Sequence, residues 1–316
     1  MIDDARTYAF LGPAGTFTQM ALHEWVGDEP HEQVPHGSVD AALSALRAGE
    51  VDAAVVPIEN SVEGGVSATL DALAGGGPLL LVGEVLVPIT FVLAARPGTR
   101  LEDVRAVGTH SHAWAQVRGW MHTHLPRATY VPTLSTASGA QGLAVLAGEG
   151  DRDTAHYEAA VCAPVAASNH GLDVLAEGIE DNTSAVTRFV VVSRPGSVPP
   201  ATGKDKTTLV AYQRADRAGG LLELLEQFSV RGINMTRLES RPTKASMGSY
   251  CFSIDIEGHV SDERVGEALM GLKRVCADVR FLGSYPRADG GEAEVHEHTS
   301  DDAFGEARAW LRSLRG

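Results

Sequence analysis

Three polar segments of the sequence lie directly next to apolar runs that suit strands. In an α/β protein, such segments are the loops that carry functional side chains. In the segment from Gly12 to Thr18, backbone N–H groups at a helix start and threonine hydroxyls can hold an anion. The segment from Pro57 to Gly65 has more polar side chains than a plain connection needs. In Thr187-Arg188-Phe189, an arginine enters an apolar strand, so it must meet a carboxylate of the protein or of a ligand. These residues favour chemistry on an anionic ligand.

Each segment also has a purely structural interpretation, which the residues alone leave open. The glycines of the first segment can serve only a tight turn, and Asn60 or Ser61 can serve only as a helix N-cap. Arg188 can equally form an ion pair within the protein. His110 and His112, two residues apart where a helix begins, point in different directions and predict no metal site.

Composition limits the class of protein that holds these segments. The 316 residues suffice for two domains, 44% of them are hydrophobic, and 26 basic against 41 acidic residues give a net charge of −15. Such a charge repels nucleic acids and acidic membranes. Three cysteines without metal-binding spacing, an N-terminus unlike a signal peptide and interrupted apolar runs predict a cytoplasmic protein without a membrane span.

From Thr7 to Ser193, short apolar runs alternate with helical patterns, which predicts parallel strands covered by helices. Strands are expected at residues 8–11, 53–56, 79–82, 90–93, 106–108, 160–163 and 189–192, and helices at 17–26, 39–48, 113–124 and 137–147. Because ligands of open α/β sheets bind beyond the carboxyl ends of strands, the polar loops should meet there.

The C-terminal part reads as a separate domain. Residues 194–206 are rich in proline and glycine and predict a linker. Beyond it, the order β (209–213), α (219–230), β (234–239), β (249–257), α (262–275), β (279–284) predicts a ferredoxin-like βαββαβ sandwich, whose sheet has one buried and one polar face. Residues 287–316 predict an acidic tail, disordered at first, that ends in a short amphipathic helix.

Together these segments resemble the prephenate dehydratases, lyases of phenylalanine biosynthesis that turn prephenate into phenylpyruvate, water and carbon dioxide. The resemblance covers Thr7 to about Ser284 and rests on Gly12-Pro13-Ala14-Gly15-Thr16-Phe17-Thr18, Val56-Pro57-Ile58-Glu59-Asn60-Ser61, Ser135-Thr136-Ala137, Thr187-Arg188-Phe189 and Glu239-Ser240-Arg241-Pro242. It implies a two-lobed α/β catalytic domain over residues 7–193, similar to type II periplasmic binding proteins, with the site between the lobes. It also implies a phenylalanine-sensing ACT domain over residues 207–286.

The resemblance implies roles for individual residues as well. Thr187 should assist departure of the prephenate hydroxyl as a hydrogen-bond donor or relay, Arg188 and Thr16 should hold carboxylates, and Phe189 should shape the pocket. Asn60, Thr109 and Gln116 should orient the ring and the leaving hydroxyl. Further substrate-binding residues are expected to be Glu59, Ser61, His110, Ser135 and Thr136. No cofactor and no metal is expected.

Regulation and assembly follow from the same resemblance. Phenylalanine is expected between ACT domains of a homodimer or homotetramer, at Gly219, Gly220, Leu221, Leu222, Asn234, Glu239 and Ser240. The chain departs from the family at Thr109, where Ser is usual, at His112, where Gln is usual, and at Ala218, where Pro is usual. Two alternatives remain: an arogenate dehydratase, whose substrate carries an amino group in place of the keto group, and a non-catalytic carboxylate-binding regulator.

Overall fold

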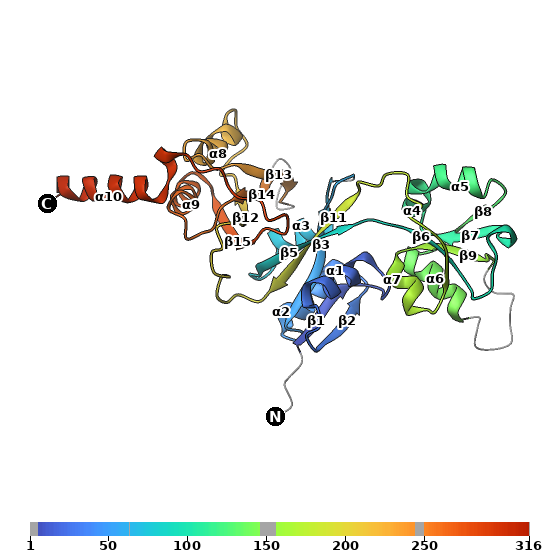
Figure 1. Cartoon of the computed structure of the whole chain (residues 1–316). Coiled ribbons are helices and arrows are strands. Elements are labelled where there is room, and N and C mark those ends of the chain that lie inside the picture. Colours follow the sequence, from blue (N-terminus) through green and yellow to red (C-terminus); the bar gives the residue numbers. More distant parts are fainter. Residues whose placement is uncertain (1–5, 63, 146–155, 244–249, 316) are drawn as a thin grey trace, which may run out of the picture. The chain divides into compact units, whose positions relative to one another are not determined.

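The computed structural model of the chain describes residues 6–62, 64–145, 156–243 and 250–315, and these form three β-sheets with their helices (Figure 1). By their contacts the residues group into two compact units. Unit 1 consists of Met1–Ala45, Ala54–Gly64 and Val85–Phe189, and unit 2 of Leu46–Ala53, Gly65–Glu84 and Val190–Gly316. Two stretches from the first half of the chain therefore belong to the same unit as its C-terminal part. Within the described ranges, no helix is long and apolar enough to cross a membrane.

The first sheet has the strand order β2-β1-β3-β11-β5, with β4 beside β3. Its strands are β1 (Arg6–Leu11), β2 (His31–His36), β3 (Ala53–Asn60), β4 (Gly64–Gly65), β5 (Leu80–Pro88) and β11 (Val186–Ser193), and its helices are α1 (Phe17–Val26), α2 (Val39–Ala48) and α3 (Ser67–Ala74). Helix α2 begins where predicted, because the Ser38 hydroxyl accepts a hydrogen bond from the Ala41 N–H at 3.1 Å. Strand β2 was not predicted, since its sequence is polar and includes Pro35, which suits an edge strand.

The second sheet has the order β10-β6-β9-β7-β8. Its strands are β6 (Val92–Ala95), β7 (Ala106–Thr109), β8 (Thr129–Pro132), β9 (Ala159–Cys162) and β10 (Asp173–Glu177), and its helices are α4 (Ser111–Gln116), α5 (Arg118–His124), α6 (Thr136–Val145) and α7 (Pro164–Asn169). Strand β7 runs parallel to β8 and β9, but β6 is antiparallel to β9 and β10. The prediction of parallel strands is wrong for β6, because its connection to β7, the next strand of this sheet along the chain, contains only a 3-10 turn (Leu101–Asp103) and not the longer helical crossover that a parallel arrangement uses.

Of the two helices predicted in this region, one needs correction, and the other extends beyond the described residues. The helix predicted at 113–124 is two helices, α4 and α5, because the backbone of Val117 leaves the helical conformation at φ −121° and ψ 10°. The predicted end of the next helix, at residues 146 and 147, lies outside the described residues, as does the predicted strand start at Ser249.

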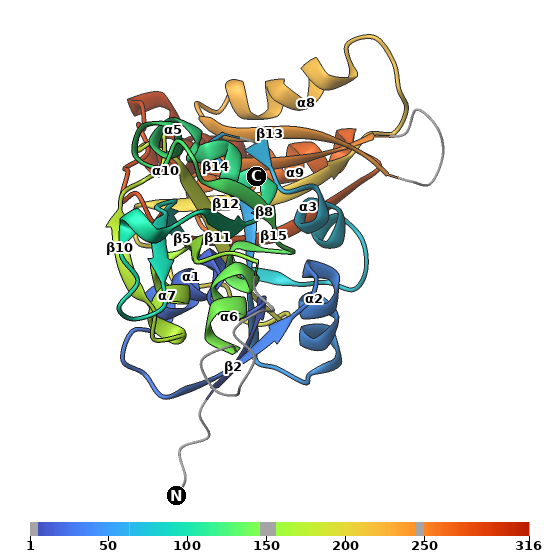
Figure 2. The same cartoon turned by 90° about the vertical axis from the view of Figure 1, so that its right-hand side faces the viewer.

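The third sheet confirms the predicted βαββαβ order. It consists of β12 (Asp205–Tyr212), β13 (Met235–Pro242), β14 (Tyr250–Glu257) and β15 (Asp278–Pro286), in the antiparallel order β13-β14-β12-β15, with α8 (Gly220–Ser229) and α9 (Glu263–Val275). One sheet face, which includes Leu209 and Ile254, packs against Leu224 and Phe228 of α8 and Val265 of α9. Figure 2 shows both helices beside this sheet. The chain therefore has the predicted α/β architecture with a C-terminal ferredoxin-like sandwich.

The opposite face of this sheet is polar, as predicted, but it is buried. Lys206 Nζ lies 2.9 Å from both carboxylate oxygens of Glu84, and only 1% of the Glu84 side chain is exposed. Arg237 pairs with Asp255, which is fully buried, at 2.9 Å. The Tyr212 hydroxyl donates to the Ala74 carbonyl. Residues 65–84 therefore cover this face within unit 2, and opposite charges compensate each buried charge.

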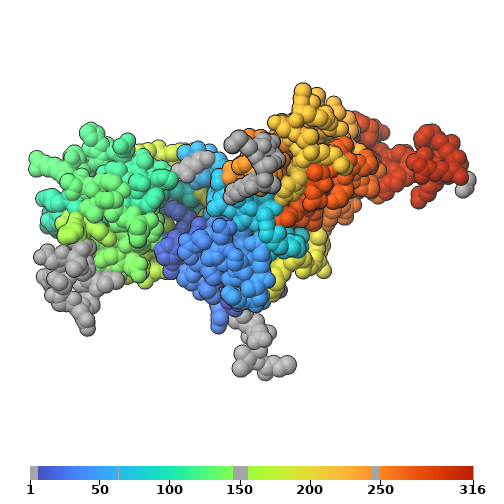
Figure 3. Space-filling view, turned by 180° about the vertical axis from the view of Figure 1, so that it is seen from behind, coloured from blue at the N-terminus to red at the C-terminus, as the bar shows by residue number. Residues whose placement is uncertain are grey.

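The predicted amphipathic helix at the C-terminus also forms. Helix α10 (Asp301–Arg315) follows a short 3-10 turn, η2 (Glu297–Thr299), and Arg308 pairs with Glu263 of α9. Trp310 and Leu314 are 64% and 63% exposed, and Figure 3 shows the surface of this helix in red. The Asp301 carboxylate also accepts from the Glu263 N–H at 2.9 Å, so contacts in its first half hold the helix, while its apolar side chains near the end face outward.

Candidate active site

Unit 1 contains a cavity of about 390 Å³ where strands β1, β3 and β7 end and strand β11 begins. Polar loops meet at this place, as expected for the carboxyl ends of strands in an α/β sheet. The wall consists of Leu11, Gly12, Thr16, Phe17, Thr18, Pro57, Asn60, Ile89, Phe91, His110, His112, Ala113, Gln116, Leu134, Ser135, Thr136, Thr187 and Phe189. The structure thus brings together Thr187, Phe189, Asn60, Gln116, Thr16, His110, Ser135 and Thr136 from the predicted site.

Thr187 and Asn60 form the most defined polar contact of the wall. The Asn60 side-chain N–H donates to the Thr187 hydroxyl oxygen at 2.8 Å, and the Asn60 side-chain oxygen accepts from the Val62 N–H at 2.8 Å. These two bonds fix which end of the Asn60 amide faces Thr187. Because the Thr187 oxygen accepts this bond, its own hydrogen is available to donate toward the cavity.

Two helices of ten residues begin at the cavity, and their first residues lie in its wall. Thr16 precedes α1, and its hydroxyl donates to the Leu11 carbonyl at 3.2 Å. Ser135 precedes α6, where its hydroxyl accepts from the Ser138 N–H at 2.9 Å while the Ser135 N–H donates to the Ser138 hydroxyl at 2.8 Å. The side chain of Ser135 thus caps its helix, and the positive ends of both helices favour an anion.

Helix α4 and its N-cap residue His110 also border this cavity, the helix with His112 and Gln116. The His110 ring nitrogen Nδ1 accepts from the His112 N–H at 3.3 Å, which caps the helix, and the two imidazole rings meet edge to face with their centroids 5.0 Å apart. The Gln116 side-chain N–H donates to the His112 carbonyl at 3.3 Å. In the described ranges, no cluster of three metal-binding side chains occurs, so these histidines carry no metal argument.

The apolar part of the wall includes Phe17, Ile89 and Phe91, which the sequence did not predict, beside the predicted Phe189. The rings of Phe17 and Phe91 meet edge to face with centroids 5.6 Å apart, and Ile89 and Phe189 complete a surface that suits a ring-shaped ligand. Ile89 and Phe91 lie between β5 and β6, where the sequence shows only an apolar run. Nothing local in that run distinguishes a cavity wall from a protein core.

Four predicted residues do not line the cavity: Glu59, Ser61, Thr109 and Arg188. Arg188 lies on the face of β11 opposite to Thr187 and Phe189, because side chains alternate along a strand, and its guanidinium is 3.5 Å from the Glu59 carboxylate. Thr109 is fully buried, and its hydroxyl donates to the Val161 carbonyl at 2.8 Å. Ser61 binds the Val186 backbone, with its N–H donating and its hydroxyl accepting.

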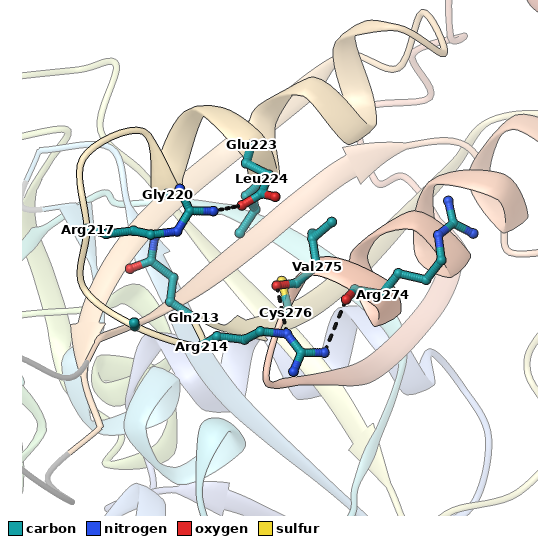
Figure 4. A pocket seen from close by; sticks show the side chains of 10 residues that line it. Gln213, Arg214, Arg217, Gly220, Glu223, Leu224, Arg274, Val275 and Cys276 are labelled. Atoms are coloured by element: carbon teal, nitrogen blue, oxygen red, sulfur yellow. Dashed lines mark hydrogen bonds and ion pairs between the residues drawn. The ribbon is translucent and has the colours of Figure 1, made fainter.

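A second cavity of about 220 Å³ lies in unit 2, beside the loop between β12 and α8 (Figure 4). Arg214 donates to the carbonyls of Arg274 and Val275 at the end of α9, and Arg217 pairs with Glu223. Burial and the nearby Glu223 raise the pKa of the Cys276 thiol, so this thiol stays neutral. Gly220 is the one predicted effector residue in this wall.

The other predicted effector residues are dispersed within the chain. Gly219 adopts a left-handed conformation with φ +80°, and Leu221 and Leu222 are exposed on the first turn of α8. Asn234 binds Glu257 at the sheet end opposite to the β12–α8 loop, and Ser240 is exposed. The Glu239 carboxylate lies over the backbone of Gly65, where a Cβ atom would be 1.9 Å from it.

The chain is similar to known proteins both in sequence and in structure. The family model described as prephenate dehydratase matches residues 8–197. A prephenate dehydratase of Amycolatopsis methanolica is 46% identical over 97% of both chains. The crystal structure of a prephenate dehydratase of Arthrobacter aurescens in complex with L-Phe is 55% identical, covers 98% of this chain and 100% of its own, and superimposes with a TM-score of 0.91. The structure of GqqA, described as a novel type of quorum quenching acylase, is 30% identical, with 89% and 98% of the chains covered and a TM-score of 0.78.

Proposed function

Because the chain belongs to the prephenate dehydratase family, we propose that the cavity of unit 1 binds prephenate and removes its hydroxyl and its ring carboxylate. The reaction produces an aromatic ring, so its difficult step is the departure of a poor leaving group, hydroxide. A hydrogen bond or a proton supplied to the departing oxygen contributes about 10²- to 10⁴-fold in reactions of this kind. The residues of the cavity wall are therefore assigned by what each offers to that oxygen and to the two carboxylates.

The contact between Asn60 and Thr187 is the observation that carries this assignment. Asn60 donates to the Thr187 oxygen, so the Thr187 hydrogen can be donated to the departing hydroxyl. A threonine hydroxyl is too weak an acid to transfer its proton unaided, so Thr187 acts as a donor or relay. Gln116 offers a further amide, and the rings of Phe17, Phe91 and Phe189 enclose the cyclohexadiene ring and exclude water.

For Arg188 we propose a different role from the one expected. Its position behind the cavity wall and its contact with Glu59 favour the alternative of an ion pair that joins β11 to β3. Thr109 similarly anchors β7 to β9 through the Val161 carbonyl. We therefore assign carboxylate binding to backbone N–H groups at the starts of α1 and α6, with Thr16 and Thr136 beside them.

Regulation by phenylalanine is part of the proposal. The relative of Arthrobacter aurescens was crystallised with L-Phe, and this chain has the βαββαβ fold of residues 207–286 on which an ACT sensor would be built. Residues 7–193 are assigned to catalysis, 194–206 to the linker and 287–316 to a tail. Asn234 lies far from the β12–α8 loop within one chain, which supports an effector site shared between subunits of a homodimer or homotetramer.

A cytoplasmic location is also proposed, and the cysteines support it. Cys162, Cys251 and Cys276 are free and buried, as in proteins of reducing compartments.

Turnover of prephenate by the purified chain tests the proposal. Formation of phenylpyruvate should be rapid and should fall when phenylalanine is added, and arogenate should be the poorer substrate. Preference for arogenate would make the chain an arogenate dehydratase, and binding of phenylalanine without turnover of either substrate would make it a regulator. Turnover that phenylalanine leaves unchanged, with no heat of binding by calorimetry, would contradict the regulatory part alone.

A further inference from the structure

The two carboxylates of prephenate are assigned to the starts of α1 and α6, so binding depends on the separation of these two helix starts. The carboxylates are joined by a few covalent bonds. Both helix starts can therefore hold one of them at the same time only over a narrow range of separations. Both helices belong to unit 1, and a contact directly behind the cavity wall joins the turn before α1 to the first turn of α6.

Gly15, in the turn before α1, lies against two helices of the second sheet. A Cβ atom on Gly15 would be 3.0 Å from the Cβ atom of Ala166 in α7 and 3.4 Å from that of Ala137 in α6. Gly15 has φ +85°, a left-handed conformation that glycine adopts without strain. Gly15 directly precedes Thr16, and Ala137 directly follows Thr136. The contact therefore lies immediately behind Thr16 and Thr136 of the cavity wall.

The side chain of Gln19, in α1, holds this contact by hydrogen bonds. Its oxygen accepts from the Gly15 N–H at 2.6 Å and from the Asn169 side-chain N–H at 3.1 Å. Gln19 is 9% exposed, and Asn169 is the last residue of α7. One buried oxygen thus joins the turn before α1 to a helix of the second sheet.

The polar groups next to Gln19 determine which way its amide points. The Gln19 side-chain N–H donates to the Gln33 side-chain oxygen at 2.8 Å, and the Gln33 N–H donates to His31 Nε2 at 2.8 Å. Nδ1 of His31 donates to the Glu29 carbonyl at 2.7 Å, because a carbonyl oxygen only accepts. Each amide in this series has one consistent orientation, which keeps the Gln19 oxygen toward α7.

We propose that Gln19 and Asn169 are positioning residues that set the separation of the two helix starts and thereby favour a ligand with two carboxylates. This inference rests on the proposed function and adds residues that determine substrate affinity. Neither side chain lines the cavity, so both act through the turn at Gly15. The contact between Asn60 and Thr187, assigned to departure of the hydroxyl, joins β3 to β11. The effect therefore belongs to KM and not to kcat.

Two variants of the full chain test the proposal with two ligands, prephenate, which has two carboxylates, and phenylpyruvate, which has one. Gln19→Leu loses both hydrogen bonds and should raise the KM for prephenate about 10-fold. Asn169→Ala keeps the bond to Gly15 and should raise it about threefold. In both variants kcat should stay within about threefold, and the inhibition constant of phenylpyruvate, measured in competition with prephenate, should change less than about twofold.

Gln141→Leu is the matched control, because it makes the same exchange at an exposed glutamine of α6 outside the cavity wall. It should leave KM, kcat and the inhibition constant unchanged. Circular dichroism checks that each variant is folded. If Gln19→Leu does not fold, Asn169→Ala decides, since Asn169 is exposed at a helix end and its replacement leaves the buried Gln19 in place.

An unchanged KM for prephenate in the folded variants would overturn the inference. A parallel rise of KM and of the phenylpyruvate inhibition constant would also overturn it, because damage to the whole cavity weakens binding of one carboxylate and of two alike. Absence of turnover by the unaltered chain contradicts the proposed function, and the inference fails with it. These results are distinguishable because the first two require measured turnover.

Discussion

Thr187→Ala lowers kcat for prephenate at least about 100-fold, with the protein still folded, if the Thr187 hydroxyl assists departure of hydroxide. The substitution removes the one hydroxyl of the wall that Asn60 orients, at 2.8 Å. Thr187→Ser keeps a hydroxyl and should recover most of the activity. Stopped assays of phenylpyruvate formation, with circular dichroism as a check of folding, measure both variants.

Two further variants make this result specific. Thr183→Ala makes the same change at an exposed threonine four residues earlier and should leave kcat unchanged. Asn60→Ala should lower kcat, and the double variant with Thr187→Ala should be little worse than Thr187→Ala alone, because the two residues act as one unit. Near-normal turnover of Thr187→Ala would remove Thr187 from the reaction.

Lys206→Met lowers the free energy of unfolding by about 3–5 kcal/mol, the largest stability effect that we expect. The substitution leaves the Glu84 carboxylate buried without its cation, since only 1% of that side chain is exposed and Lys206 Nζ contacts both of its oxygens. Urea denaturation of the full chain measures the loss. Adding Glu84→Leu to Lys206→Met removes the uncompensated charge and should restore part of the stability.

An exposed ion pair provides the control for this effect. Lys273 and Asp278 are 2.8 Å apart, with 65% and 57% of their side chains exposed. Lys273→Met should therefore cost less than about 1 kcal/mol, because water screens the pair. Equal losses from Lys206→Met and Lys273→Met would mean that burial does not decide the contribution of the first pair.

Local sequence patterns predicted most helices and strands, and their failures have identifiable causes. The bounds of α1 and the order of the C-terminal sandwich followed from periodicity and end signals, which are local. The direction of β6 and the burial of the polar face of β14 were not predictable, because both depend on which distant segment packs alongside. From the sequence alone, Ser253 and Asp255 are expected to face solvent, but in the structure Arg237 binds both of them and Thr208 donates to Asp255.

In the candidate site, too, local sequence predicts some features, while others depend on contacts between segments that are far apart in the chain. The alternation of β11 requires that Thr187 and Phe189 share one face and that Arg188 takes the other, but it does not tell which face borders the cavity. Ile89 and Phe91 reach the cavity wall through contacts with distant segments, since the Ile89 N–H donates to the Ala185 carbonyl and the Phe91 ring meets the Phe17 ring. The residue types of the loops predicted an anion site, while the structure decided which side chains reach it.

The grouping of residues 65–84 with the C-terminal sandwich has a consequence for recombination between relatives. A crossover in the linker would join a foreign sandwich to a native segment 65–84, and the foreign chain would have to supply its own equivalents of Lys206, Arg241 and Arg280 at the right positions. We therefore expect a well-folded chimera only when the sandwich and segment 65–84 come from the same parent. The unit to exchange in such a chimera is discontinuous in sequence, with parts both before and after residues 85–189.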